Sequence, residues 1–133
     1  MNPGLRIVIV DDQAQTRNSL KALFASVRPE IKVVGEAADG QEALQQVEHT
    51  RPDVVLMDAR MPTMDGLEAT RQIKARWPEV KVIFLTLNML RPDAAWAAGA
   101  DAFLIKGCTA EELVNTIVNT SGAADKSKKP LAG

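Results

Sequence analysis

The sequence predicts one α/β domain with a parallel five-stranded sheet, and three observations lead to this fold class. Short apolar runs alternate with longer segments whose apolar residues recur at helical spacing. The apolar runs are unbroken, which is typical of strands buried on both faces of a parallel sheet. The length of 133 residues suits a single compact domain. Alternation at this spacing indicates right-handed strand–helix–strand units, and no domain boundary is expected before residue 121.

The expected strands are short apolar runs, most of which end at a polar side chain. The first run ends at Asp11, and the third run, Val54–Met57, ends at Asp58. Asp39 and Gly40 supply turn chemistry after the second run. The expected strands are residues 5–10, 31–37, 53–58, 80–85 and 101–105.

Five segments are expected as helices because their apolar residues recur every three or four positions. Pro29 and Pro78 end the first and the third of them. Pro92 suits the first position of the fourth helix, and Gly99 suits its end. Thr109 suits the N-cap of the fifth helix, which has acidic residues in its first turn. The expected helices are residues 16–27, 41–49, 66–77, 92–99 and a last helix that opens at 109 and ends near 121.

Composition and charge exclude several functions. The net charge of −1 gives no electrostatic footprint for nucleic-acid binding, and no apolar run approaches the roughly 20 residues that a membrane span needs. Residues 1–4 lack a signal-peptide pattern, so a cytoplasmic protein is expected. Cys108 is the only cysteine and cannot form an internal disulfide, and a single histidine, His49, excludes a zinc site rich in His and Cys.

Four of the expected strands end in residues with useful side-chain chemistry. These residues are Asp11 and Asp12, Asp58, Thr86 and Lys106. In a parallel sheet the carboxyl ends of the strands share one edge, where open α/β sheets bind ligands. Three carboxylates, one hydroxyl and one ammonium are therefore expected to converge in a single pocket.

This set of groups favours binding and transfer of a phosphoryl group. Clustered carboxylates repel one another, and either Lys106 beside Asp58 or a Mg²⁺ ion bound by the acids can compensate. Asp58 would be the nucleophile, while the metal and Lys106 would neutralise charge on the transferring group. Thr86 would donate a hydrogen bond to that group afterwards.

These residues, in this order, resemble the receiver domain of two-component response regulators, in particular the receivers of LuxR-type and NarL-type regulators. The pattern comprises Asp11-Asp12, Asp58, the turn Met61-Pro62-Thr63-Met64-Asp65-Gly66, Thr86 and Lys106. The stretches 33–37, 39–44 and 98–102 also look like that family. The resemblance covers residues 5–121, and the whole set in one order is highly specific.

The resemblance implies a flavodoxin-like, CheY-like fold with five helices and strand order 2-1-3-4-5. Residues 1–121 would form the receiver domain, and residues 122–133 a flexible tail or the start of a linker. Asp58 would accept a phosphoryl group from a sensor histidine kinase. Asp12 would bind Mg²⁺ directly and Asp11 mainly through water, and the backbone carbonyl of Arg60 would complete the protein ligands.

The resemblance also implies a switch between two packings of the domain. On phosphorylation Thr86 would move inward, and Phe103 would follow into the vacated space. The surface of the fourth helix, fifth strand and fifth helix would then change and control an output domain or partner. A DNA-binding output domain outside this chain and a phosphorylation-dependent homodimer are further implications.

Three features depart from the family pattern. The chain from Thr86 to Lys106 is shorter than expected, so the fourth helix is expected to be short, displaced or partly unwound. Gly107 follows Lys106 where many receivers have a proline, so this peptide bond need not be cis. Phe103 stands where a tyrosine is common, so it can switch by packing only.

Three other residues are expected to have structural or solvated side chains, and two of them also have a functional alternative. Trp77 and Trp96 are expected to be packing residues, with exposure of Trp96 on an output surface as the alternative. Arg60 is expected to be solvated, and the alternative is that it controls access of water to the phosphoryl group.

Two other functions stay open. An adaptor would keep the fold and bind partners without phosphate, and the shortened fourth helix is its only support. A metal-dependent phosphatase of the haloacid-dehalogenase type needs a second acid two residues after the nucleophile, where Arg60 stands in this sequence. We therefore expect a protein that catalyses only its own phosphoryl transfer and slow self-dephosphorylation.

Overall fold

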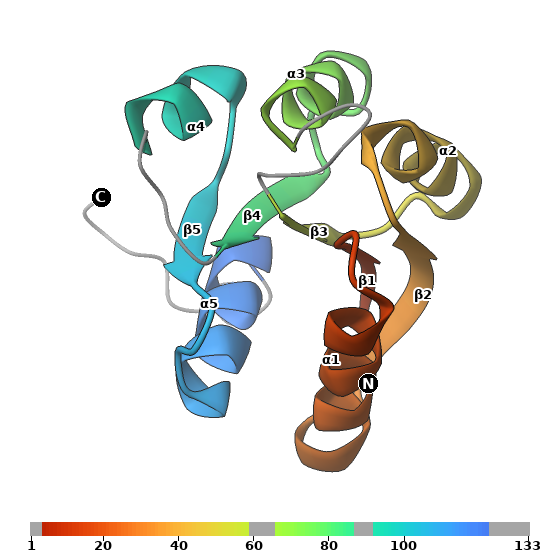
Figure 1. Ribbon diagram of the computed structural model, residues 1–133, viewed down its shortest axis with the longest axis vertical. Coiled ribbons are helices and arrows are strands. Elements are labelled where there is room, and N and C mark those ends of the chain that lie inside the picture. Colours follow the sequence, from red (N-terminus) through yellow and green to blue (C-terminus); the bar gives the residue numbers. More distant parts are fainter. Residues whose placement is uncertain (1–3, 59–65, 87–91, 123–133) are drawn as a thin grey trace.

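The structure is a computed structural model that describes residues 4–58, 66–86 and 92–122. Five strands form one parallel sheet in the order β2-β1-β3-β4-β5, which confirms the predicted fold class and strand order. Helices cover both faces of the sheet (Figure 1), and none of the described helices is long and apolar enough to cross a membrane. The elements are β1 (Leu5–Val10), α1 (Ala14–Val27), β2 (Ile31–Ala37), α2 (Gly40–Thr50), β3 (Val54–Met57), α3 (Gly66–Arg76), β4 (Lys81–Thr86), α4 (Pro92–Ala98), β5 (Ala102–Ile105) and α5 (Ala110–Ser121).

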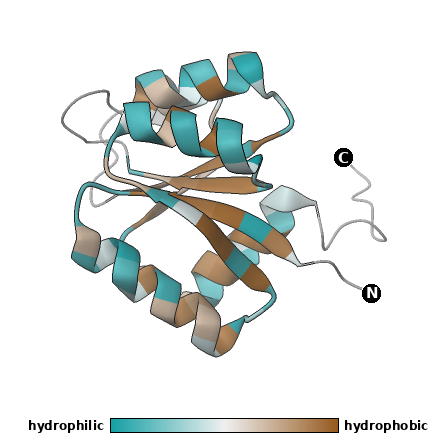
Figure 2. Cartoon of the chain, turned by 90° about the vertical axis from the view of Figure 1, so that its right-hand side faces the viewer, coloured by the Kyte–Doolittle hydropathy of each residue, from teal (hydrophilic) through white to brown (hydrophobic). Residues whose placement is uncertain are grey.

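Both faces of the sheet are buried, because the central strands carry apolar residues at successive positions. Val8 and Val10 of β1 pack in a cluster with residues of α2, α3 and α4. Ile7 and Ile9 of the same strand pack on the other face with residues of α1 and α5. Figure 2 shows the apolar strands enclosed between the two helical layers. The unbroken apolar runs therefore reflect strands that are covered on both sides, as predicted.

Two helices begin at side-chain caps, and one of these caps, Thr109, is predicted by the sequence. The Thr109 hydroxyl accepts the Glu112 amide at 3.0 Å, and the Glu112 carboxylate accepts the Thr109 amide at 2.9 Å. Asp39 caps α2 by accepting the Glu42 amide at 2.9 Å. These bonds satisfy amides that have no partner within the first turn of a helix. The cap predicted at Thr109 is therefore confirmed, whereas Asp39, predicted only as a turn residue, also caps α2.

The first helix differs from its prediction. α1 begins at Ala14 rather than Thr16, and its N-cap residue, Gln13, makes no side-chain hydrogen bond that would mark the start. Phe24 is buried as its position in the apolar pattern predicts, whereas Val27, which fits the same pattern, is 46% exposed. Apolar spacing identifies a helix face but not how far along the helix the core extends.

The fourth helix is short, as the reduced spacing before Lys106 predicts. α4 has seven residues, and Gly99 follows it with a positive φ of 105°. Lys74 of α3 lies against this turn, since a Cβ at Gly99 would come within 2.8 Å of the Lys74 Cγ. The Lys74 ammonium donates to the Val80 carbonyl at 2.8 Å and to Asp101 at 3.0 Å. α3 therefore fixes the end of α4 and the start of β5.

The two tryptophans differ in exposure. Trp77 is buried, as expected, with 7% of its surface exposed, but Trp96 is 50% exposed, so the packing prediction for Trp96 is wrong. The cause is that α4 packs on the core through small side chains, Ala95 and Ala98, which leaves Trp96 on the outer side. The Trp96 ring lies against Phe103 of β5, with 5.2 Å between the ring centroids.

Candidate metal and phosphoryl-transfer site

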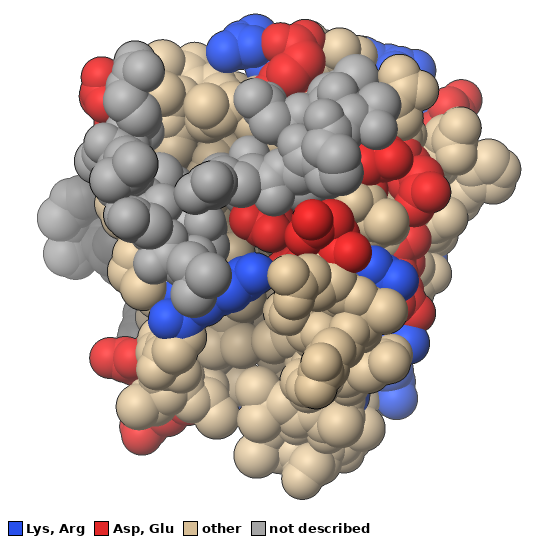
Figure 3. Space-filling model, viewed as in Figure 1, with Lys and Arg blue, Asp and Glu red and all other residues tan. Residues whose placement is uncertain are grey.

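Three aspartates meet at the carboxyl ends of β1 and β3. The two strands pair in parallel with Val10 opposite Met57, so Asp11 and Asp58 follow at neighbouring positions. The amide of Asp58 donates to the carbonyl of Val10 at 3.0 Å and extends this pairing. Asp11, Asp12 and Asp58 each place a carboxylate oxygen within 4.8 Å of the others. Figure 3 shows acidic atoms gathered near the middle of this face, beside basic atoms.

The three aspartates differ in exposure and in their partners. Asp11 and Asp58 are buried, with 3% and 7% of their surface exposed, whereas Asp12 is exposed. Asp11 accepts the Gln13 amide at 2.9 Å on Oδ1 and the Lys106 ammonium at 2.6 Å on Oδ2. Lys106 also lies 3.6 Å from the Asp58 carboxylate. A buried carboxylate needs hydrogen bonds or an opposite charge nearby. Lys106 provides both buried carboxylates with a positive charge, and it lies closer to Asp11 than to Asp58.

The Lys106 ammonium is a fixed counter-charge for this cluster. Burial by itself lowers the pKa of Lys106, but the hydrogen bond to Asp11 and the charges of Asp58 and Asp11 outweigh burial. The pKa of Lys106 is therefore raised above lysine's ordinary range. The positive charge persists at neutral pH and reduces the repulsion that an incoming anion would meet from the aspartates.

The raised pKa of Lys106 links folding stability to alkaline pH. Because folded Lys106 holds its proton more tightly than the unfolded chain does, its stabilisation is complete below about pH 10.4 and is lost as the pH rises through the folded-state pKa. We expect the free energy of unfolding to fall more steeply above this pH in the wild type than in Lys106→Met. Urea titrations of both proteins at a series of pH values measure the difference. Parallel pH curves for the two proteins would contradict the expectation.

The residues after Lys106 form a turn that proline could not adopt. Gly107 has a φ of 101°, whereas the proline ring fixes φ near −65°. All peptide bonds of the described residues are trans, including the one that joins Lys106 to Gly107. Cys108 follows, half-buried, and burial raises the pKa of its thiol, which disfavours the reactive thiolate.

The remaining predicted residues are placed to different extents. Thr86 ends β4 opposite Ile105 of β5, so its backbone stands at the same edge of the sheet, while its side chain lies outside the described part of the chain. Arg60 and its backbone carbonyl also lie outside the described residues. Phe103 is half-buried on β5 and packs against the core cluster beneath α2, α3 and α4.

The acid cluster fits a hard divalent cation. Asp11, Asp12 and Asp58 offer carboxylate oxygens, the ligand type that Mg²⁺ prefers. The exposure of Asp12 leaves that side open to water, and Mg²⁺ retains several waters when it binds to proteins. Three carboxylates facing one ammonium leave an excess of negative charge that a cation would compensate.

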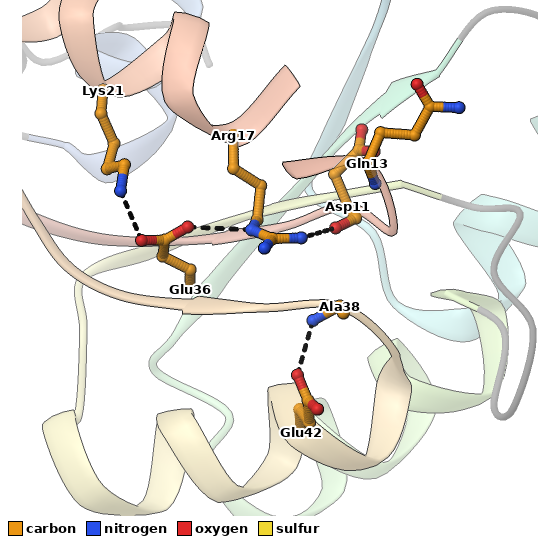
Figure 4. A network of polar contacts seen from close by, with 7 residues as sticks. All are labelled: Asp11, Gln13, Arg17, Lys21, Glu36, Ala38 and Glu42. Atoms are coloured by element: carbon orange, nitrogen blue, oxygen red, sulfur yellow. Dashed lines mark hydrogen bonds and ion pairs between the residues drawn. The ribbon is translucent and has the colours of Figure 1, made fainter. Parts of the chain in front are cut away.

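Sequence reasoning missed a polar network that supports this site (Figure 4). Arg17 of α1 donates from Nη1 to the Asp11 carbonyl at 2.7 Å and from Nε to Glu36 of β2 at 2.8 Å. Lys21 donates to the other oxygen of Glu36 at 2.5 Å. No spacing in the sequence connects these side chains, because their contact depends on how α1 crosses the edge strand β2.

The fold and the acid cluster together define a receiver domain. The family model of the response regulator receiver domain matches residues 7–118, so this chain belongs to that family, whose members are components of two-component systems. The chain is 43% identical over 114 residues to the transcriptional regulatory protein YhcZ of Bacillus subtilis, covering 84% of this chain and 53% of YhcZ. It thus spans about half the length of the curated relatives that it matches.

Two solved structures support the same assignment. A LuxR-family two-component response regulator from Aurantimonas sp. SI85-9A1 superposes with a TM-score of 0.83 and 33% identity, over 90% of this chain and 86% of that chain. The receiver domain of the sensor histidine kinase PA1611 from Pseudomonas aeruginosa PAO1 gives a TM-score of 0.79 and 32% identity, over 90% and 98%. The PA1611 structure has a magnesium ion coordinated in its active-site cleft.

Proposed function

We propose that this chain is the phosphorylation-controlled receiver of a response regulator and that Asp58 accepts the phosphoryl group. The observation that carries the proposal is the convergence of three carboxylates within 4.8 Å, with the Lys106 ammonium at 2.6 Å and 3.6 Å from two of them. Asp58 follows the central strand β3, whose pairing on both sides makes it a rigid support for a nucleophile.

The phosphodonor is the phosphohistidine of a sensor histidine kinase. A carboxylate oxygen of Asp58 forms a bond to phosphorus while the phosphorus–nitrogen bond of the donor breaks. The electron pair of the broken bond stays on the donor imidazole, which takes up a proton from water. Lys106 neutralises charge on the transferring group, and the Thr86 hydroxyl donates a hydrogen bond to it afterwards.

The residues that would hold Mg²⁺ are Asp11, Asp12 and Asp58 together with the backbone carbonyl of Arg60. When bound, the ion would neutralise charge on the transferring group. Both oxygens of Asp11 already accept hydrogen bonds, from Gln13 and Lys106, which favours contact through water for Asp11. The exposed Asp12 is better suited to direct ligation. Magnesium in the cleft of the PA1611 receiver supports the same choice of ion.

Phosphorylation shifts the domain between two packings, with Thr86 and Phe103 as the moving residues. Because the Phe103 ring lies 5.2 Å from the Trp96 ring, a displacement of Phe103 reaches the exposed surface of α4. A shift from a mostly inactive to a mostly active population requires about 5.5 kcal/mol of differential stabilisation between the two packings. The surface of α4, β5 and α5 then controls a DNA-binding output domain outside this chain, with a phosphorylation-dependent homodimer as the active form.

Phosphorylation by a small donor tests this function. The protein is incubated with acetyl phosphate and Mg²⁺, and its intact mass is measured. We expect a gain of one phosphoryl group, which chelation of the metal and Asp58→Ala abolish. Asp93→Asn, which removes an exposed carboxylate of α4, should keep the gain. Steady phosphate release over many turnovers would favour a phosphatase, and no adduct with any donor would favour an adaptor.

A further inference from the structure

We infer that Arg17 is a positioning residue for the acid site, which it fixes through the backbone of Asp11 while Glu36 holds the guanidinium in place. The inference rests on the proposed function, because the site that Arg17 positions is the proposed magnesium and phosphoryl site. Arg17 acts on the main chain of the β1–α1 turn and not on the phosphoryl group, so its role is orientation rather than catalysis.

The Arg17 side chain joins three segments of the fold. It leaves the first part of α1, donates from Nη1 to the Asp11 carbonyl at 2.7 Å, and donates from Nε to Glu36 at 2.8 Å (Figure 4). The guanidinium is a planar fork with fixed angles between its donors, so the position of Glu36 sets the position of Nη1. The end of β1 is thereby tied to both α1 and β2.

The acceptor is well placed to orient the acids. The Asp11 carbonyl belongs to the planar peptide that joins Asp11 to Asp12, so its direction constrains where both side chains leave the chain. The same turn is held elsewhere by the Asp11 amide, which donates to the Ala37 carbonyl at 3.0 Å, and by the Gln13 amide, which donates to Asp11 Oδ1 at 2.9 Å. Arg17 supplies the third support.

This support matters because α1 begins without a side-chain cap. Gln13, the N-cap residue, makes no side-chain capping hydrogen bond, so the first turn of α1 lacks the usual side-chain cap. Arg17 is mostly buried, with 18% of its side chain exposed, which favours a single orientation. Hydrogen bonds from Lys21 and Arg17 hold the pKa of Glu36 below its usual range, so Glu36 is ionised at neutral pH and keeps the guanidinium paired.

The positive charge of Arg17 and its hold on the Asp11–Asp12 peptide predict opposite changes in Mg²⁺ affinity when Arg17 is removed. If its positive charge were its main influence, Arg17→Ala would strengthen Mg²⁺ binding, because a cation near the metal site would be lost. If the hydrogen bond to the Asp11 carbonyl is its main influence, Arg17→Ala weakens Mg²⁺ binding, because the peptide between Asp11 and Asp12 gains freedom. Residues that orient metal ligands typically contribute 10- to 100-fold to affinity.

A magnesium titration followed by the amide resonances of Asp12 and Gln13 tests the inference. We expect Arg17→Ala to raise the dissociation constant for Mg²⁺ by about tenfold. Arg17→Lys keeps the charge but lacks the fork, so it should also weaken binding, and it serves if Arg17→Ala does not fold.

Lys21→Ala is the matched control, because it removes a cation from the same Glu36 without touching Asp11. It should leave Mg²⁺ affinity within about twofold of the wild type. A second measurement needs no metal: hydrogen exchange at the Gln13 amide should be faster in Arg17→Ala and unchanged in Lys21→Ala.

These measurements separate failure of the inference from failure of the proposed function. Unchanged or tighter Mg²⁺ binding by folded Arg17→Ala and Arg17→Lys would overturn the positioning role. A wild type that binds no Mg²⁺ would overturn the proposed function. In that case Gln13 exchange still decides whether Arg17 fixes the turn, and equal exchange in wild type and Arg17→Ala would show that it does not.

Discussion

Lys106→Met is expected to slow phosphorylation of Asp58 by about a hundredfold or more, because a preorganised cation for the transferring group is lost. The same change should strengthen Mg²⁺ binding. In the wild type the ammonium competes for the same carboxylates, lying 2.6 Å from Asp11 and 3.6 Å from Asp58. Opposite effects on the two quantities distinguish a charge that acts during transfer from a residue that only keeps the site folded.

The experiment compares Lys106→Met with Lys32→Met, which removes an exposed lysine of the edge strand β2. Phosphorylation by acetyl phosphate at saturating Mg²⁺ gives the rate, and a magnesium titration gives the affinity. Lys32→Met should match the wild type in both. Phosphorylation of Lys106→Met at the wild-type rate would mean that Lys106 has no part in the transfer.

Phe84→Ala is expected to lower the free energy of unfolding by about 3–5 kcal/mol, the usual cost of truncating a buried phenylalanine. Phe84 lies on β4 with 0% of its surface exposed and packs in the cluster between the sheet and α2, α3 and α4. The ring fills this layer two residues before Thr86. Its removal leaves a cavity that the surrounding strands cannot close without moving.

The matched comparison is Phe103→Ala, which truncates the same side chain at the half-buried position opposite Phe84 on β5. Because less apolar area leaves water on folding there, we expect a loss of about 1–2 kcal/mol. Urea denaturation of the two variants measures both values. Equal losses would show that burial in this layer does not determine the stability of the sheet.

The sheet and most of the site could be predicted because they depend on local sequence. Each buried strand is an unbroken apolar run, and in a parallel sheet the residue that follows such a run must lie at the ligand-binding edge. This reasoning places Asp11, Asp58 and Lys106 together without knowledge of any contact between them. The proposed roles of Thr86 and Arg60 go beyond those contacts and stay predictions.

The features that the sequence did not reveal depend on packing between elements. Arg17 and Glu36 lie on different elements, and only the crossing of α1 over β2 lets the Arg17 guanidinium donate to both Glu36 and the Asp11 carbonyl. Trp96 resembles a core residue by type, but α4 buries its alanines instead. The start of α1 lacks a side-chain cap, so no residue type marks it.

The most direct measurement of the central claim is the location of the phosphoryl group. The protein is phosphorylated with acetyl phosphate and Mg²⁺, cleaved at acidic pH, and its peptides are sequenced by mass spectrometry. The account predicts a single modified residue, Asp58. Modification of Asp11, Asp12 or a residue outside the acid cluster, with Asp58 unmodified, would contradict it.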